Sequence, residues 1–210
     1  MNGFFNYDGF LVKILTKVMY VVSLNLLFLI CSIPIVTIGA ANTAMHTVLL
    51  RFHQGDDPHI MKGFFGAFRD NFKKATLVWL VMLALGGTLG LNYIVLYQSH
   101  IPGADLIRVL LNLVLIVLLV LWVYIFPAIA YFENSIKGYV IFSVGLAVAR
   151  LPYTVGLVLL QTLPLLGMLF LAQFIPSAVL LLICCCASLP AYFSAPLLLC
   201  LFGCYEDEQP

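Results

Sequence analysis

The segment "FLICSIPIVTIGAANTAMHTVLLRFHQG", residues 28–55, decides how this chain folds. An apolar helix runs into Pro34, yet the sequence stays uncharged until Arg51. Small and hydroxyl-bearing residues follow the proline, where a first transmembrane helix would normally end in a charged loop. We interpret Pro34 and Gly39 as the break of a helical hairpin, because small residues allow two helices to approach closely.

The composition places most of the chain in a membrane. Of its 210 residues, 63% are hydrophobic and 9% are charged, whereas soluble domains carry about 25% charged residues. A spanning helix needs about 20 mainly apolar residues. We therefore expect one integral membrane domain over residues 1–210, an all-α bundle whose main partner is the lipid bilayer. The net charge of +1 gives no basis for binding nucleic acid.

Four long apolar runs supply most of the expected spans. The last run is too long for one helix, and a break at "AQFIP" divides it into spans near residues 153–172 and 177–202. This division gives five helices, and the segment 35–52 is then the undecided part of the topology. The four runs cover residues 18–33, 75–97, 106–131 and 151–202.

The distribution of basic residues favours a sixth span, because Lys and Arg accumulate in cytoplasmic loops. If residues 35–52 stay on one side of the membrane, seven cations oppose three. If the segment crosses, nine lie on one side and only Arg108 lies on the other. Eighteen helical residues extend about 27 Å, which suits a thin hydrocarbon core. We predict six spans with both termini cytoplasmic; five spans plus a re-entrant segment are the alternative.

Residues 60–75 are expected to form an amphipathic helix on the cytoplasmic surface. Aromatic residues recur at i, i+4 and i+8, and basic residues occupy the remaining face. This pattern is typical of a helix in the headgroup region of an anionic membrane. A docking helix for a partner protein is the alternative. The candidate residues for either role are Met61, Phe64, Phe65, Phe68, Phe72, Lys73 and Lys74.

Few polar residues lie inside the expected spans. Such groups must find partners in lipid, and most make hydrogen bonds between helices. The alternative is that they line a path for a solute, and His46 is the candidate among them that could titrate. The polar candidates are Asn25, Asn42, Thr43, His46, Asn92, Asn112 and Gln161.

The sequence offers no pattern for catalysis. It contains no nucleotide-binding loop, HExxH motif or CxxC motif, and no plausible pair of catalytic carboxylates. His53, Asp56, Asp57 and His59 could bind a metal, but a Gly-Asp-Asp-Pro turn before the next helix is the favoured interpretation. The run 184–186 of three cysteines is interpreted as structural. We expect no enzyme, no cofactor and no metal.

The order of these features resembles a known family. The stretch "LNLLFLICSIPIVTIGAANTAMHTVLLRF" precedes a short acidic turn, then "FFGAFRDNFKKATLVWL" and a late "LP". This order resembles the YesL family of bacterial integral membrane proteins of unknown function. The resemblance covers essentially the whole chain and is most specific over residues 24–80. The last helix departs from the family pattern because it is rich in cysteine and ends in "YEDEQP".

The resemblance implies a location and a field of activity. Such proteins reside in the bacterial cell (inner) membrane and are often encoded beside sugar ABC transporters. We therefore expect a non-enzymatic accessory to an ABC-type carbohydrate transport system that contacts permease subunits through helix 60–75 and the first hairpin. An autonomous small-solute transporter or channel is the competing expectation, and a homo-oligomer is compatible with both. The family has no established site residues to carry over to this chain.

Overall fold

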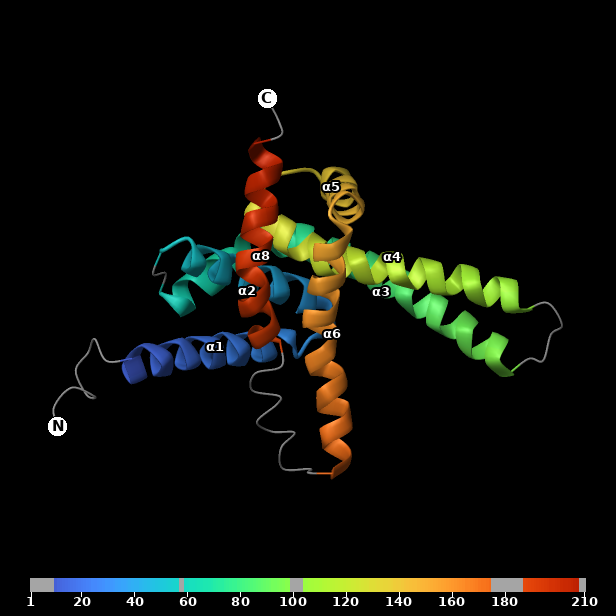
Figure 1. Ribbon diagram of the computed structural model, residues 1–210, viewed down its shortest axis with the longest axis horizontal. Coiled ribbons are helices and arrows are strands. Elements are labelled where there is room, and N and C mark those ends of the chain that lie inside the picture. Colours follow the sequence, from blue (N-terminus) through green and yellow to red (C-terminus); the bar gives the residue numbers. More distant parts are fainter. Residues whose placement is uncertain (1–9, 57–58, 99–103, 175–186, 208–210) are drawn as a thin grey trace.

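The computed structural model describes residues 10–56, 59–98, 104–174 and 187–207, and every regular element in these ranges is a helix. The elements are α1 (Phe10–Ser32), the 3-10 turn η1 (Ile35–Thr37), α2 (Ile38–His53), α3 (Ile60–Gln98), α4 (Ala104–Tyr131), α5 (Ile136–Ala149), α6 (Leu151–Phe174) and α8 (Ser188–Asp207). Figure 1 shows α1 and the α3–α4 hairpin extending to opposite sides of a central body, which α6 and α8 cross.

The helix at the centre of this body is α2. It has 16 residues, and every residue from Gly39 to Leu50 is buried. Helices α1, α3, α4 and α8 all pack against it. Gly39 and three alanines present little side-chain volume, so the neighbouring helices can surround α2 closely. A short helix that mixes small, apolar and a few polar residues therefore lies at the core of the bundle.

The chain turns back after α1, as the break at Pro34 predicts. The Thr37 hydroxyl lies within hydrogen-bonding distance of the carbonyl oxygens of Cys31, at 2.5 Å, and Pro34, at 2.7 Å. At the far end of α2, the ring of Phe52 lies 4.5 Å from the ring of Tyr20 in α1. The end of α2 has therefore returned to the level of Tyr20 in α1.

The tightest packing at Gly39 joins α2 to α3. A Cβ atom on Gly39 would lie 2.5 Å from Cβ of Trp79 and 2.6 Å from the carbonyl oxygen of Ala75, both in α3. The Trp79 indole Nε1 also donates a hydrogen bond of 2.6 Å to the Ile35 carbonyl. The small residues were expected to bring α2 close to the preceding span. Helix α1 does contact α2, but at Gly39 the closest approach is to α3.

Residues 60–75 do not form a separate helix. They are the first four turns of α3, which continues for 39 residues, a length of about 58 Å. Phe64 is fully buried and Ala67 is 8% exposed, so this face packs into the core of the protein. Met61 and Phe65 point outward and are exposed. The aromatic repeat that suggested a surface helix therefore serves partly to pack α3 on the bundle.

Six spans are not confirmed by the described residues. Helix α2 is shorter than a typical span, and the start of the expected span 177–202 lies outside the described ranges. One further span would arise if α5 and α6, which are bent by 108° at their junction, crossed together. The four described helices that are long and apolar enough to cross a membrane are Ile14–Ser32, Ile60–Leu96, Asp105–Tyr131 and Ser188–Tyr205.

Most of the segment between α4 and α6 is the helix α5. The Ser135 hydroxyl caps its start by accepting a hydrogen bond of 3.2 Å from the Gly138 amide. After the bend, the Thr154 hydroxyl in α6 lies 2.9 Å from the Tyr124 hydroxyl of α4. This buried contact holds the bend against α4. The residues that follow Phe174, where the "AQFIP" break was expected to end, lie outside the described ranges.

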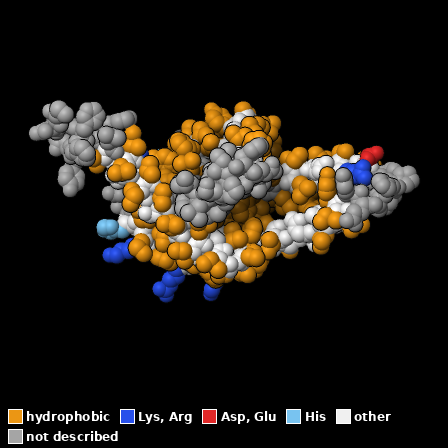
Figure 2. Space-filling view, turned by 90° about the horizontal axis from the view of Figure 1, so that it is seen from below, with side chains coloured by type: hydrophobic (Ala, Val, Ile, Leu, Met, Phe, Trp, Pro, Cys, Tyr) orange, Lys and Arg blue, Asp and Glu red, His pale blue; other side chains and the backbone are white. Residues whose placement is uncertain are grey.

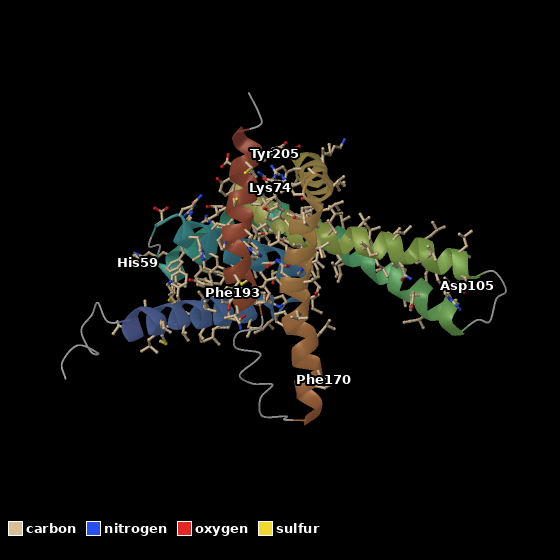
Figure 3. All side chains as sticks on the ribbon, in the orientation of Figure 1. His59, Lys74, Asp105, Phe170, Phe193 and Tyr205 are labelled. Atoms are coloured by element: carbon tan, nitrogen blue, oxygen red, sulfur yellow. The ribbon has the colours of Figure 1, made fainter. Side chains whose placement is uncertain are left out.

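Apolar side chains cover most of the surface. Figure 2 shows them over the body and the hairpin, with Lys and Arg side chains along one edge of this view. One ion pair lies away from this edge. It joins Asp105 and Arg108 with an N–O distance of 3.0 Å, and Asp105 lies at the tip of the α3–α4 hairpin (Figure 3). A surface of this kind, on several helices long enough to span a bilayer, indicates a multi-pass membrane protein.

Candidate functional site

A cavity of about 410 Å³ lies beside α2. Its volume falls in the range of about 300–1,000 Å³ that is typical of small-molecule sites. Five helices contribute to its wall, which carries no charged side chain among the described residues. The lining residues are Phe28, Asn42, Met45, His46, Leu119, Trp122, Val123, Gln161, Thr162, Ala187, Pro190 and Ala191.

The polar side of the cavity begins with α2. Asn42 and His46 are four residues apart, so they share one face of this helix. Both side chains are buried, and His46 is only 3% exposed. The Nδ1 atom of His46 has no hydrogen-bond partner among the described residues. A buried nitrogen without a partner is costly, so His46 adds an unsatisfied polar group to the side of α2 that borders the cavity.

Helix α6 supplies two further polar groups, Gln161 and Thr162, which are partly exposed. The Thr162 hydroxyl donates a hydrogen bond of 2.8 Å to the Val158 carbonyl one turn earlier. Its oxygen lone pairs then stay available as acceptors. The amide of Gln161 adds both a donor and an acceptor. The cavity therefore offers hydrogen bonds of both kinds without a formal charge.

An aromatic side chain from α4 forms another part of the wall. Trp122 packs edge to face with Trp79, at a ring distance of 5.1 Å, and with Phe126, at 4.9 Å. These contacts fix the indole, because each neighbour belongs to the packed region around α2. Phe28 of α1 also lines the cavity. Apolar rings beside uncharged hydrogen-bonding groups suit a ligand that has both an apolar face and hydroxyl groups.

The wall from α8 is positioned by Asn25 of α1. The Asn25 side-chain oxygen accepts hydrogen bonds from the backbone amides of Ala187, at 3.3 Å, and Ser188, at 3.2 Å. The Ser188 hydroxyl in turn donates to the Val21 carbonyl at 2.9 Å. Asn25 therefore caps the start of α8 from another helix, in the manner of an N-cap side chain. Ala187, Pro190 and Ala191 line the cavity from the start of this helix.

The polar residues predicted from the sequence thus divide into three that meet and four that do not. Asn42, His46 and Gln161 come together in the cavity, whereas Asn25 caps α8. Thr43 is fully buried, but it does not line the cavity. The remaining two, Asn92 and Asn112, are exposed on the α3–α4 hairpin, and Asn92 donates to the Thr88 carbonyl of its own helix.

Thr162 and Trp122 are two residues of the cavity wall that were not predicted from the sequence. Thr162 follows Gln161 directly, so the polar pair inside an apolar run was a signal that could have found it. Trp122 gave no such signal, because an aromatic residue in a transmembrane run normally packs in the core or at the interface. Its place in the wall depends on how α4 packs against α2.

The residues predicted for docking divide by exposure. Phe64 is buried and Phe68 is partly buried, whereas Met61 is 63% exposed, Phe65 47% and Phe72 37%. Lys73 and Lys74 are exposed on the same helix, and Lys74 is labelled in Figure 3. The described residues therefore leave a narrower strip of apolar side chains for contact than the sequence suggested.

One of the residues considered as metal ligands, His53, makes contacts within the protein instead. The Nδ1 atom of His53 lies 2.9 Å from the Leu49 carbonyl oxygen, and its ring lies 4.7 Å from the ring of Tyr192. Among the described residues, no three His, Cys, Asp or Glu side chains gather into a metal site. Asp57, Pro58 and the cysteines at 184–186 lie outside the described ranges.

A second hollow, of about 500 Å³, lies at the α4–α5 turn and is lined by Glu133, Asn134 and Tyr205 among others. Several of its polar groups already have hydrogen-bond partners. The Tyr139 hydroxyl donates to the Phe132 carbonyl at 2.8 Å and accepts from the Asn134 amide at 2.9 Å. Because these groups have partners, this hollow gives a weaker indication of a ligand than the α2 cavity does.

Comparison with known proteins points to an uncharacterised group. A family described as "Protein of unknown function, DUF624" matches residues 21–93, which run from the second half of α1 through α2 into α3. The chain is also similar to "Uncharacterized protein YteU" of Bacillus subtilis (strain 168), with 25% identity over 155 residues, 73% of this chain and 68% of that protein. No solved structure matches. These findings support a resemblance to an uncharacterised bacterial family, while the narrower YesL assignment stays an expectation.

Proposed function

We propose that this chain is a non-enzymatic membrane protein of solute uptake, and that the α2 cavity binds a small uncharged polar molecule. The observation that carries the proposal is the uncharged polar wall that Asn42 and Gln161 share with His46, whose buried Nδ1 atom has no partner among the described residues. An ionic ligand would face no opposite charge in this wall. A neutral ligand would satisfy the exposed hydrogen-bonding groups at no such cost.

A small carbohydrate or polyol fits this chemistry best. Its hydroxyl groups match the amides and the imidazole, and its C–H face matches the ring of Trp122. The expected connection with carbohydrate transport, which rests on the resemblance to the YesL family, points to the same class of ligand. We place the protein in the bacterial cell (inner) membrane with both termini cytoplasmic, because that orientation leaves nearly all cations on one side.

Ligand-dependent thermal stability tests the proposal. The purified protein in mild detergent is heated with each of a panel of small sugars and polyols, and one or more should raise its unfolding midpoint. A ligand at about one hundred times its Kd stabilises by about 2.7 kcal/mol. His46→Leu and Asn42→Leu should abolish the shift, whereas Asn112→Leu on the exposed hairpin should retain it. Equal shifts in all variants, or none in the unmodified protein, would refute the cavity as the site.

An accessory role is the second candidate, and the exposed strip of Met61, Phe65 and Phe72 favours it. These apolar side chains lie among exposed lysines on the first part of α3, a suitable surface for a permease subunit of an ABC-type transporter. The tagged protein is purified from its native membrane, and co-purifying proteins are identified by mass spectrometry. Permease subunits that are lost from a variant with all three residues changed to Ser would support docking. A protein recovered alone would exclude it.

A further inference from the structure

A groove of about 200 Å³ between α1 and α8 has the features of a lipid site. On α1 it is lined by Ile14, Lys17, Val18, Val21 and Val22, which share one helical face. On α8 it is lined by Leu189, Tyr192 and Phe193, again one face. Phe193 is labelled on α8 in Figure 3. Apart from Lys17 and Tyr192, the wall is entirely apolar.

The contacts between α1 and α8 fix the position of the two helices on either side of the groove. Val21 is 5% exposed and forms part of the floor, and its carbonyl accepts the hydrogen bond from Ser188. The outer walls are exposed, with Val18 at 49% and Phe193 at 55%. The first two turns of α8 also border the α2 cavity, through a different set of residues. These are Ala187, Pro190 and Ala191. The groove and the cavity are therefore separate sites on two faces of one helix.

The charge of the groove selects its occupant. Lys17 is exposed, no salt bridge to it occurs within the described residues, and no acidic side chain lines the groove. Both walls belong to helices that are long and apolar enough to span a membrane, and acyl chains are the medium expected around such helices. A long lysine side chain in this setting extends toward the phosphate level of the bilayer. We propose that the groove binds an anionic phospholipid, with one acyl chain along its apolar walls and the phosphate at Lys17.

Native mass spectrometry can test this proposal on the full-length protein. The purified protein is mixed in mild detergent with dioleoyl phosphatidylglycerol or, separately, with dioleoyl phosphatidylcholine at the same concentration. One lysine near the membrane surface contributes about 1 kcal/mol to binding an anionic lipid, so we expect about fivefold tighter binding of the first phosphatidylglycerol molecule. Lys17→Gln should remove this preference. Lys137→Gln, an exposed lysine on α5, should retain it.

A second variant separates the groove from general charge attraction. Val18→Trp would fill the groove with an indole, so it should weaken binding of both lipids by a similar factor while leaving Lys17 in place. Equal binding of the two lipids by the unmodified protein would overturn the proposal, as would an unchanged preference in Lys17→Gln. Dimers that form in detergent and dissociate in Val18→Trp would also overturn it, because a second copy of the chain would then occupy the groove.

Discussion

Gly39 shows how one residue can set the distance between helices. A Cβ atom at this position would meet a backbone oxygen and the first side-chain carbon of a tryptophan, neither of which can move away. We expect Gly39→Ala to destabilise the fold by about 1–3 kcal/mol, the usual effect of overpacking. The measurement is the thermal unfolding midpoint in detergent. As a control, Gly66→Ala in α3 meets no atom within 4 Å and should be neutral or slightly stabilising. Equal midpoints for the two variants would contradict this reason for the glycine.

Asn25 illustrates a different use of a polar residue inside a membrane helix. Its side chain satisfies two amides at the start of α8 that have no partner within their own helix. We expect Asn25→Leu to cost about 1–3 kcal/mol, because buried donors would lose their acceptor. Hydrogen exchange of peptides that cover residues 187–193 should become faster. Asn112→Leu makes the same exchange of side chains at an exposed position without a hydrogen bond, and it should leave this peptide unchanged.

At the scale of the element, α3 combines two tasks that the sequence suggested were separate. Its first turns bury Phe64 against the core and expose Phe65, the next residue along the chain. We expect Phe64→Ser to lower stability by about 3–5 kcal/mol, because the change removes a fully buried ring. Phe65→Ser should leave the unfolding midpoint nearly unchanged. If the two variants unfold at the same temperature, residues 60–75 do not pack on the bundle as described.

The apolar runs of the sequence predicted the helices α3 and α4 better than the details of α3 and of the α5–α6 bend. The apolar runs 75–97 and 106–131 were found because length and composition alone identify a helix in lipid. The continuity of α3 was not predicted, since a basic face followed by an apolar run suggests two helices. The bend between α5 and α6 was also missed. It is accompanied by a contact between Tyr124 and Thr154, which are 30 residues apart, and such a contact is not visible in the local sequence.

At the scale of the whole molecule, the cavity illustrates a similar limit. Asn42, His46 and Gln161 were identified as polar residues in apolar segments, which a single sequence can show. Their convergence depends on where α6 passes α2, a property of the tertiary packing. Asn92 and Asn112 have the same local signature and nevertheless face outward, because a polar residue in a helix does not reveal which face is covered.

The arrangement of charge along the α3–α4 hairpin leads to a prediction of topology. The two helices run antiparallel, with the rings of Trp79 and Trp122 in contact at 5.1 Å. Gly55 and Glu133 therefore belong to one end of the hairpin and Asp105 to the other. The exposed cations of the first turns of α3 lie at the first end, whereas Arg108 at the second end is neutralised by Asp105. The positive-inside rule then places Gly55 and Glu133 in the cytoplasm.

An epitope tag inserted into the full-length chain tests this orientation. A tag beside Asp105 should bind antibody on intact spheroplasts, because the neutral tip of the hairpin would lie outside the cell membrane. Tags after Gly55 and after Glu133 should bind only once the membrane is permeabilised. If the tags after Gly55 and Glu133 lay on opposite sides, the hairpin could not cross the membrane as a pair. If all three were reversed, the cluster of cations would face outward, and the charge rule would not determine how this protein inserts.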